Sequence, residues 1–237
     1  MRPLNDPNCK IGLALSGGGF RASLFHLGAL RRLNEAGLLS RVSVISSVSG
    51  GSILAGLLAV RWGNLTVDPA TGRFLNFEAE VEKPMTHYCG ENLRNAVIVG
   101  DRLNPLNWPK LFRDDFSLTN ILAQHYDRDL LGGARLDVLR KVEEGGGPRF
   151  VFCATSMDTG VLFRFEANRV GDWIRGYIPP PDWTLGLAVA ASSAFPIAFP
   201  PLELTFPEAE WKNGDCPDAG LLQTLRTRAA LTDGGVY

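Results

Sequence analysis

The residue best placed for chemistry in this sequence is Ser49, which stands at the boundary between two contrasting segments. Residues 42–46 are rich in β-branched residues and are predicted to form a strand, whereas residues 50–58 are rich in helix formers. A serine at such a strand–turn–helix bend presents its hydroxyl group beyond the end of the sheet, and the first N–H groups of the helix point toward it. Ser49 is therefore a candidate nucleophile. The alternative is a Ser/Gly-rich turn that only caps a helix.

The residues around Ser49 follow the nucleophile-elbow pattern Gly-x-Ser-x-Gly except at its first position, where Ser47 replaces the glycine. The tight turn of an elbow brings two backbones close together, so small residues are needed on both sides of the serine. Ser47 and Gly51 are both small. We expect them to form the two sides of the elbow.

A run of three glycines at residues 17–19 has two interpretations. Residues 17–22 match the dinucleotide fingerprint G-x-G-x-x-G up to its last position, which is alanine, but the acidic residue expected after the second strand is absent. In the other interpretation the backbone N–H groups of this glycine loop form an oxyanion hole, which needs a close approach of backbone to substrate. Ser49 at the end of the next predicted strand favours the oxyanion hole.

A single structural unit would bring these two candidate elements together. Residues 11–16 form an apolar run typical of a buried parallel strand, and residues 20–36 have the pattern of a helix. A helix that joins two strands forms a right-handed βαβ unit with parallel strands. The glycine loop and Ser49 then both lie at the carboxyl ends of strands, where open α/β sheets bind their ligands.

A serine hydroxyl group is a weak nucleophile and needs a base that accepts its proton. The familiar base is histidine, and the chain has His26, His87 and His125. An α/β-hydrolase carries its histidine after its acidic residue. All three histidines of this chain precede Asp233, its last acidic residue, and His26 falls within a predicted helix. The order of the residues therefore does not favour a serine–histidine pair.

Taken together, these motifs resemble those of the patatin-like phospholipases, and the resemblance spans most of the chain. It implies an α/β fold with three α/β/α layers and a mostly parallel central sheet, formed as a single domain over residues 1–237. The motifs that carry the resemblance are the glycine loop followed by Phe20 and Arg21, the elbow at residues 47–51, and residues 152–160, 190–201 and 233–235.

The resemblance implies a Ser–Asp dyad in which Asp233 takes the proton directly from Ser49. An exposed aspartate is a weak base, and burial beside apolar groups would strengthen it. Asp218 has a similar local sequence and is the alternative base, although the Asp-Gly-Gly sequence that begins at Asp233 fits the family better. The oxyanion hole would be formed by Gly17, Gly18 and Gly19.

The implied reaction is the hydrolysis of a lipid ester through an acyl-serine intermediate, without a cofactor and without a metal. Arg21 would either orient a phosphate headgroup or hold the glycine loop by hydrogen bonds, and its place in the first helical turn favours the second role. Two other functions stay open. One is a non-catalytic lipid- or nucleotide-binding module with the same fold, and the other is acyl transfer to an alcohol.

Composition restricts the environment in which this chemistry is expected. The formal net charge of −1 gives no electrostatic case for binding nucleic acid. The four cysteines have no CxxC spacing, which argues against a zinc site or a disulfide framework and fits a reducing compartment. No apolar stretch approaches the roughly 18 residues of a membrane span. We therefore expect a cytoplasmic location, with any membrane contact peripheral.

The middle and the end of the chain are less informative. Residues 64–147 are expected to form a helical insertion that covers the edge of the sheet. Aromatic and proline residues cluster between residues 103 and 116, where they would form either a satellite core or a lipid-facing lid. The family usually continues past the aspartate of the dyad, so a chain that ends at Tyr237 is expected to be truncated. The oligomeric state is not indicated.

Overall fold

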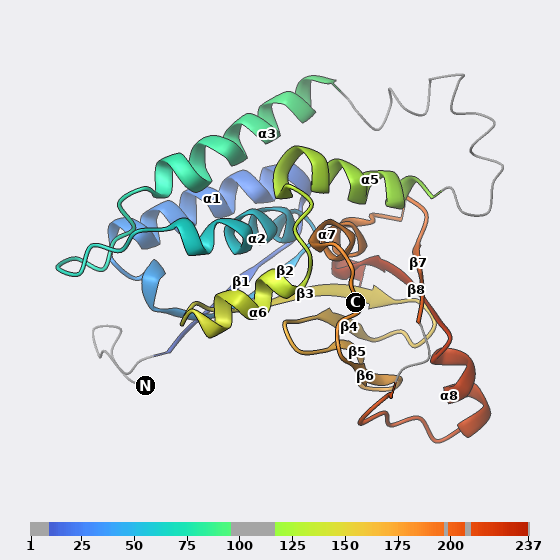
Figure 1. The fold of residues 1–237 in the computed structure, drawn as a ribbon. Helices are drawn as coiled ribbons and strands as arrows, with labels where there is room; N and C mark the ends of the chain where they lie inside the picture. The colour runs from blue at the N-terminus through green and yellow to red at the C-terminus, as the bar shows by residue number, and fades with distance from the viewer. Residues whose placement is uncertain (1–9, 96–116, 197–198, 207–209, 237) are drawn as a thin grey trace.

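The computed structural model describes residues 10–95, 117–196, 199–206 and 210–236 of the chain (Figure 1). The strands are β1 (Ile11–Leu15), β2 (Val42–Val48), β3 (Arg149–Ser156), β4 (Leu162–Phe165), β5 (Val170–Asp172), β6 (Gly176–Ile178), β7 (Leu202–Thr205) and β8 (Arg228–Asp233). The α-helices are α1 (Gly19–Glu35), α2 (Gly50–Arg61), α3 (Lys83–Asn95), α5 (Leu118–Tyr126), α6 (Asp137–Glu144), α7 (Leu185–Ser193) and α8 (Ala219–Leu225). Shorter helical turns are η1 (Leu39–Arg41), η2 (Trp62–Asn64), η3 (Glu78–Glu82), η5 (Asp127–Leu131) and η6 (Gly234–Val236).

The strands form one mixed sheet whose parallel part contains the predicted βαβ unit. β1 pairs with β2 in parallel, with Leu15 opposite Ser47, and β2 pairs with β3 in parallel. The remaining strand pairs of the sheet are antiparallel. The predicted α/β fold is confirmed as a mixed sheet flanked by helices, and β1, β2 and β3 are the strands that carry the glycine loop and Ser49.

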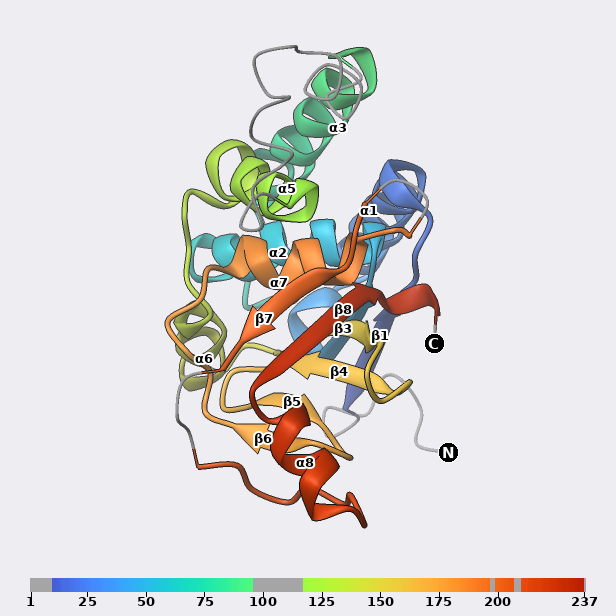
Figure 2. The ribbon, with the colours of Figure 1, turned by 90° about the vertical axis from the view of Figure 1, so that its right-hand side faces the viewer.

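β3 is the strand along which β2 and β8 meet. One edge of β3 pairs with β4 at residues 152–155, and β2 occupies the other edge up to Val48, which lies opposite Cys153. β8 continues along that second edge from the opposite direction and ends with Asp233 opposite Ala154. Figure 2 shows β8 between β7 and β3. The last residues of β2 and β8 therefore face consecutive residues of β3.

A layer of helices packs on one face of this sheet (Figure 1). α2 lies in this layer in contact with both α1 and α7, and all its residues from Gly50 to Ala59 are buried. This burial explains why its sequence is apolar all round rather than amphipathic. We expected helices on both faces. The described helices that pack on β1–β3 lie on one face, and the opposite face is exposed at Gly12, Ala14 and Val44.

The segment of residues 64–147 contains α3, α5 and α6. α3 contacts α1, and α5 contacts α7, so these two helices form an outer layer over the helices that pack on the sheet (Figure 1). α6 contacts β3 and α2. The segment thus covers helices rather than only the edge of the sheet. The aromatic and proline cluster at residues 103–116 lies outside the described residues. In the described parts of the chain, no helix has both the length and the apolar character needed to span a membrane.

Candidate functional site

Ser49 lies at the turn between β2 and α2 in a backbone conformation that is unusual for a residue with a side chain. Its φ is 53° and its ψ is −123°. Strained conformations of this kind cost about 1–3 kcal/mol and cluster at active sites. Ser49 is the N-cap residue of α2, yet its side chain makes no capping hydrogen bond, and the residue is 9% exposed. The hydroxyl group is therefore not used to cap the helix, which was the alternative role.

The two glycines after Ser49 allow α2 to begin in direct contact with the glycine loop. A Cβ atom on Gly50 would overlap the carbonyl oxygen of Gly19, and one on Gly51 would overlap the carbonyl oxygen of Leu15. Because both obstacles are backbone atoms, a side chain at either position would force the two elements apart. Gly51 therefore provides the close approach expected of the elbow.

The glycine loop borders the Ser49 side chain. A Cβ atom on Gly17 would lie 3.1 Å from Ser49 Cβ and 3.7 Å from Ser49 Oγ. Gly18 has a φ of 135° and Gly19 a φ of 62°, both in the region that favours glycine, and α1 starts here without a side-chain cap. The first N–H groups of α1 and α2 have no intrahelical partner, and both helix dipoles are positive at this end. The loop and the elbow together form a region that favours negative charge.

A cluster of buried serines holds the backbone of Ser49. The Ser49 N–H group donates to Ser192 Oγ at 3.0 Å, and Ser192 Oγ donates to the Cys153 carbonyl oxygen at 2.6 Å. Ser52 Oγ lies 2.8 Å from Ser192 Oγ and 3.0 Å from Ser47 Oγ. Ser192 was not among the residues predicted from the sequence. The sequence does carry a signal for Ser192, which follows an apolar run in α7. A hydroxyl group buried in such a helix needs hydrogen-bond partners, and this need indicates a structural role.

Asp233 ends β8 and is 4% exposed. Its Oδ1 atom accepts a hydrogen bond from the Gly235 N–H group at 2.7 Å. Its Oδ2 atom is buried and has no hydrogen-bond partner among the described residues, so Asp233 and the Ser49 hydroxyl group are not hydrogen-bonded in this structure. The Asp233 N–H group donates to the Ala194 carbonyl oxygen at 3.1 Å, and Thr155 Oγ1 donates to the Asp233 carbonyl oxygen at 3.0 Å. The backbone of Asp233 is therefore fixed while one carboxylate oxygen stays available.

Val48 connects the three parts of the site. Its Cγ1 atom lies 3.7 Å from the position of a Cβ atom on Gly17. The same atom lies 3.3 Å and 3.8 Å from the corresponding positions on Gly234 and Gly235, in the turn after β8. The glycine loop, the end of β2 and the turn after β8 therefore pack around one methyl group. Ser49, the next residue after Val48, lies at their junction.

Tyr126 of α5 brings a phenol group to the same region. Its hydroxyl group lies 3.1 Å from Ser193 Oγ, at the end of α7. Burial raises the pKa of Tyr126 to about 12, and the negative charge of Asp233 contributes to this increase. The phenol therefore stays protonated at neutral pH. Tyr126 was not predicted as a site residue, since its approach to Asp233 depends on how α5 packs on α7.

The three histidines lie in different surroundings, and in the described structure none of them hydrogen-bonds Ser49. His26 Nε2 lies 3.1 Å from the Ser16 carbonyl oxygen. His125 Nδ1 lies 3.3 Å from Asp129 Oδ2, at the surface, and His87 is exposed on α3.

Asp218, the alternative base, is the N-cap residue of α8. Its Oδ1 atom accepts hydrogen bonds from the N–H groups of Gly220 at 2.8 Å and Leu221 at 3.0 Å, and the residue is exposed. We expect Asp218→Ala to lower the free energy of unfolding by about 1 kcal/mol, because a cap is lost. Ester hydrolysis should be unchanged. Denaturant unfolding and initial rates measure both effects, and a large loss of turnover with a normal unfolding curve would restore Asp218 as a candidate base.

Arg21 is exposed in the first turn of α1, and the ion pairs of the described residues do not include it. No group of three or more His, Cys, Asp or Glu residues in the described chain could hold a metal ion. The candidate residues described above contribute hydroxyl, carboxylate and backbone N–H groups.

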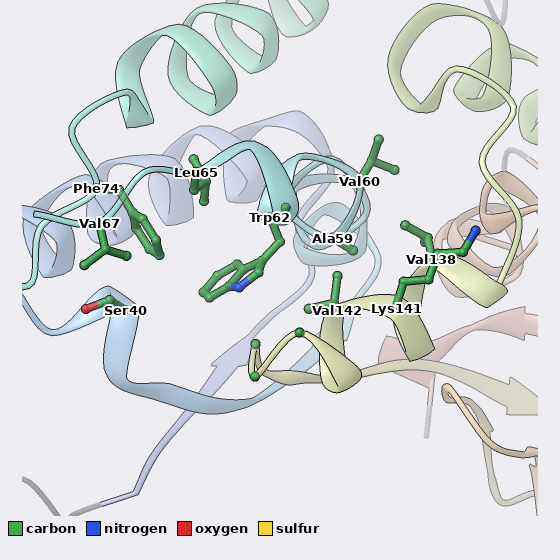
Figure 3. Close-up of a pocket in the computed structure, with 14 residues that line it drawn as sticks. Ser40, Ala59, Val60, Trp62, Leu65, Val67, Phe74, Val138, Lys141 and Val142 are labelled. Atoms are coloured by element: carbon green, nitrogen blue, oxygen red, sulfur yellow. The ribbon is translucent and has the colours of Figure 1, made fainter.

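A cavity of about 410 Å³ lies at the far end of α2. Figure 3 shows the Trp62 indole ring directed into the space between Phe74 and Val142. Since a helix rises about 1.5 Å per residue, roughly 15 Å separates this cavity from Ser49. None of the candidate residues described above lines it.

Comparisons with known proteins identify the family of the chain and its fold. A family model described as patatin-like phospholipase matches residues 13–237. The structure of human GIVD cytosolic phospholipase A2 in complex with methyl gamma-linolenyl fluorophosphonate superposes with a TM-score of 0.54 and 20% sequence identity, over 79% of this chain and 29% of that chain. A second structure of human GIVD cytosolic phospholipase A2 superposes with a TM-score of 0.53 at 21% identity, over 80% of this chain and 28% of that chain. At such identities the likeness establishes the fold.

A curated relative is the putative meiotic phospholipase SPO1 of Saccharomyces cerevisiae, with 45% identity over 51 residues. The matched region is 22% of this chain and 8% of the relative. The chain therefore spans less than a third of the length of each of these relatives.

Proposed function

This chain belongs to the patatin-like phospholipase family, and we propose that it is a lipid acyl hydrolase that uses Ser49 as nucleophile and Asp233 as base. The observation that carries the proposal is the buried Asp233 Oδ2 atom, which has no hydrogen-bond partner among the described residues. It belongs to the strand that ends beside Ser49 along the edge of β3. A buried carboxylate oxygen without a partner destabilises the folded state, and a catalytic role explains why such a group is retained.

In the first step Asp233 accepts the proton of the Ser49 hydroxyl group while Oγ attacks the ester carbonyl carbon. The backbone N–H groups of Gly17, Gly18 and Gly19, together with the start of α2, hold the oxyanion that forms. Preorganised donors of this kind are each typically worth about 10²–10³ in rate. The alcohol leaves with the proton that Asp233 carries, and an acyl-serine remains.

In the second step Asp233 accepts a proton from water as the water oxygen attacks the acyl-serine. The tetrahedral intermediate uses the same N–H groups, and its collapse returns the proton to Ser49 Oγ and releases the carboxylic acid. The strained backbone of Ser49 and the serine cluster behind it keep Oγ in one position through both steps. Holding the reacting groups in place contributes a large part of the rate in such reactions.

The proposed substrate is a lipid ester, such as a phospholipid or lysophospholipid, met at the surface of a membrane. We assign Arg21 to the binding of a charged headgroup, because its side chain is exposed in the first turn of α1, two residues after Gly19, and a guanidinium group binds phosphate oxygens well. The reaction needs neither a metal nor a cofactor.

The test uses the purified chain with a fluorophosphonate probe and a panel of phospholipid, lysophospholipid and neutral lipid esters. The proposal predicts covalent labelling at Ser49 together with release of fatty acid. Labelling without any released fatty acid, but with acyl groups found on an added alcohol, would indicate acyl transfer. Absence of both labelling and turnover would favour a non-catalytic lipid- or nucleotide-binding module.

A further inference from the structure

Two polar side chains on the buried face of α1, Ser23 and His26, bind backbone carbonyl oxygens of the site. Ser23 Oγ lies 2.6 Å from the Gly50 carbonyl oxygen and 3.3 Å from that of Gly19. His26, one turn further along α1, places Nε2 at 3.1 Å from the Ser16 carbonyl oxygen. Side chains of α1 thus bind the carbonyl oxygens of Ser16, Gly19 and Gly50, which lie next to the proposed oxyanion hole.

The chemistry of the His26 contact fixes where its proton lies. A carbonyl oxygen only accepts hydrogen bonds, so Nε2 must be the donor. Both the neutral Nε2–H tautomer and the imidazolium ion provide this donor, so the contact does not depend on the charge of the ring. Ser16 Oγ, at 3.3 Å from the same nitrogen, is able to accept as well. His26 is 7% exposed and its ring packs against Phe25, with 5.5 Å between the ring centroids.

The Ser16 carbonyl group and the Gly17 N–H group belong to the same peptide unit. Described peptide bonds are trans, so this N–H group points away from the carbonyl oxygen and hence away from His26. Gly17 also lies next to the Ser49 side chain, since a Cβ atom on Gly17 would be 3.7 Å from Ser49 Oγ. Without a donor on the carbonyl oxygen, the peptide next to two flexible glycines would be free to rotate. A rotated peptide would turn a carbonyl oxygen, in place of an N–H group, toward the developing oxyanion.

We propose that His26 is a positioning residue for the oxyanion hole: its Nε2–H group holds the Ser16 carbonyl oxygen and thereby fixes the orientation of the Ser16–Gly17 peptide beside Ser49. This inference rests on the proposed hydrolase function for its catalytic consequence. It gives His26 a role that needs no contact with Ser49, with the substrate or with the base.

The kinetic test compares His26→Phe, which keeps an aromatic ring without a donor, with His26→Gln, whose side-chain amide offers a donor. His26→Phe should lower kcat for a soluble ester such as p-nitrophenyl butyrate by about 10- to 100-fold with little change in KM, as expected for weakened stabilisation of the transition state. His26→Gln should recover most of this loss. The matched control is His87→Phe on α3, which should keep normal turnover. Equal kcat values for His26→Phe and the wild type would overturn the inference.

NMR of the Gly17 backbone amide tests the inference independently of turnover. The backbone amide signal of ¹⁵N-labelled Gly17 should shift in His26→Phe, return toward its wild-type position in His26→Gln, and stay unchanged in His87→Phe. An unperturbed Gly17 signal in His26→Phe would overturn the inference even where the wild type is active. An inactive wild type with a shifted Gly17 signal would instead refute the proposed hydrolase and leave the positioning role supported. If His26→Phe does not fold, His26→Asn, whose shorter amide falls short of the carbonyl oxygen, replaces it against His26→Gln.

Discussion

Ser49→Ala is expected to abolish ester hydrolysis, with kcat reduced by at least about 10³-fold, while the protein stays folded. The substitution removes the hydroxyl group that would attack the ester and leaves the Ser49 N–H bond to Ser192 Oγ intact. It also removes no capping interaction, because the Ser49 side chain does not cap α2. The free energy of unfolding should therefore change by less than about 1 kcal/mol. Initial rates on a soluble ester, fluorophosphonate labelling and denaturant unfolding measure these effects.

The matched control is Ser43→Ala, at the opposite end of β2, whose Oγ donates to the Ile11 carbonyl oxygen at 3.2 Å. This variant should label and turn over normally. Activity retained in Ser49→Ala would transfer the nucleophile to Ser47 or Ser52, or end the enzyme hypothesis. The structure does not favour this transfer, because the hydroxyl groups of Ser47 and Ser52 are buried and bonded to each other at 3.0 Å.

The parts of the fold that depend on local pattern were predictable. The strands predicted at residues 11–16 and 42–46 are present in the structure at residues 11–15 and 42–48. The helix between them and the helix after Ser49 also follow their sequence patterns. The rule that βαβ units are right-handed with parallel strands then predicts that the glycine loop and Ser49 lie at the same end of the sheet. Local propensity and one topological rule were sufficient for this half of the site.

The other half of the site depends on long-range pairing, which no local pattern encodes. The sequence before Asp233 is apolar, but nothing in it specifies that β8 continues the edge of β3 where β2 stops. The contact of α5 with α7 also joins segments that are remote in sequence. Ser192 and Tyr126 were missed for this reason. Their partners come from elements that are far apart along the chain.

Asp233→Asn is expected to reduce kcat about as strongly as Ser49→Ala. When two residues act as one catalytic unit, the loss of either one removes the rate enhancement that both provide. Asparagine has the size of aspartate and keeps an oxygen atom for the Gly235 N–H group. Its amide group cannot accept the Ser49 proton. The matched control is Asp218→Asn, which preserves the cap of α8, and a second control combines His87→Phe with His125→Phe. Both controls should retain turnover within about two-fold.

The free energy of unfolding of Asp233→Asn provides a second test of this prediction. In the wild type the buried Asp233 Oδ2 atom has no partner among the described residues, and an unsatisfied carboxylate in such a place destabilises the folded state. Replacing it with a neutral amide should leave the free energy of unfolding unchanged or raise it by about 1 kcal/mol, as is common when a catalytic group is removed. The double variant Ser49→Ala with Asp233→Asn should be no slower than either single variant, since each already removes the complete unit. Turnover within a few-fold of wild type in Asp233→Asn would exclude Asp233 as the base, and a multiplicative loss in the double variant would show that the two residues act separately.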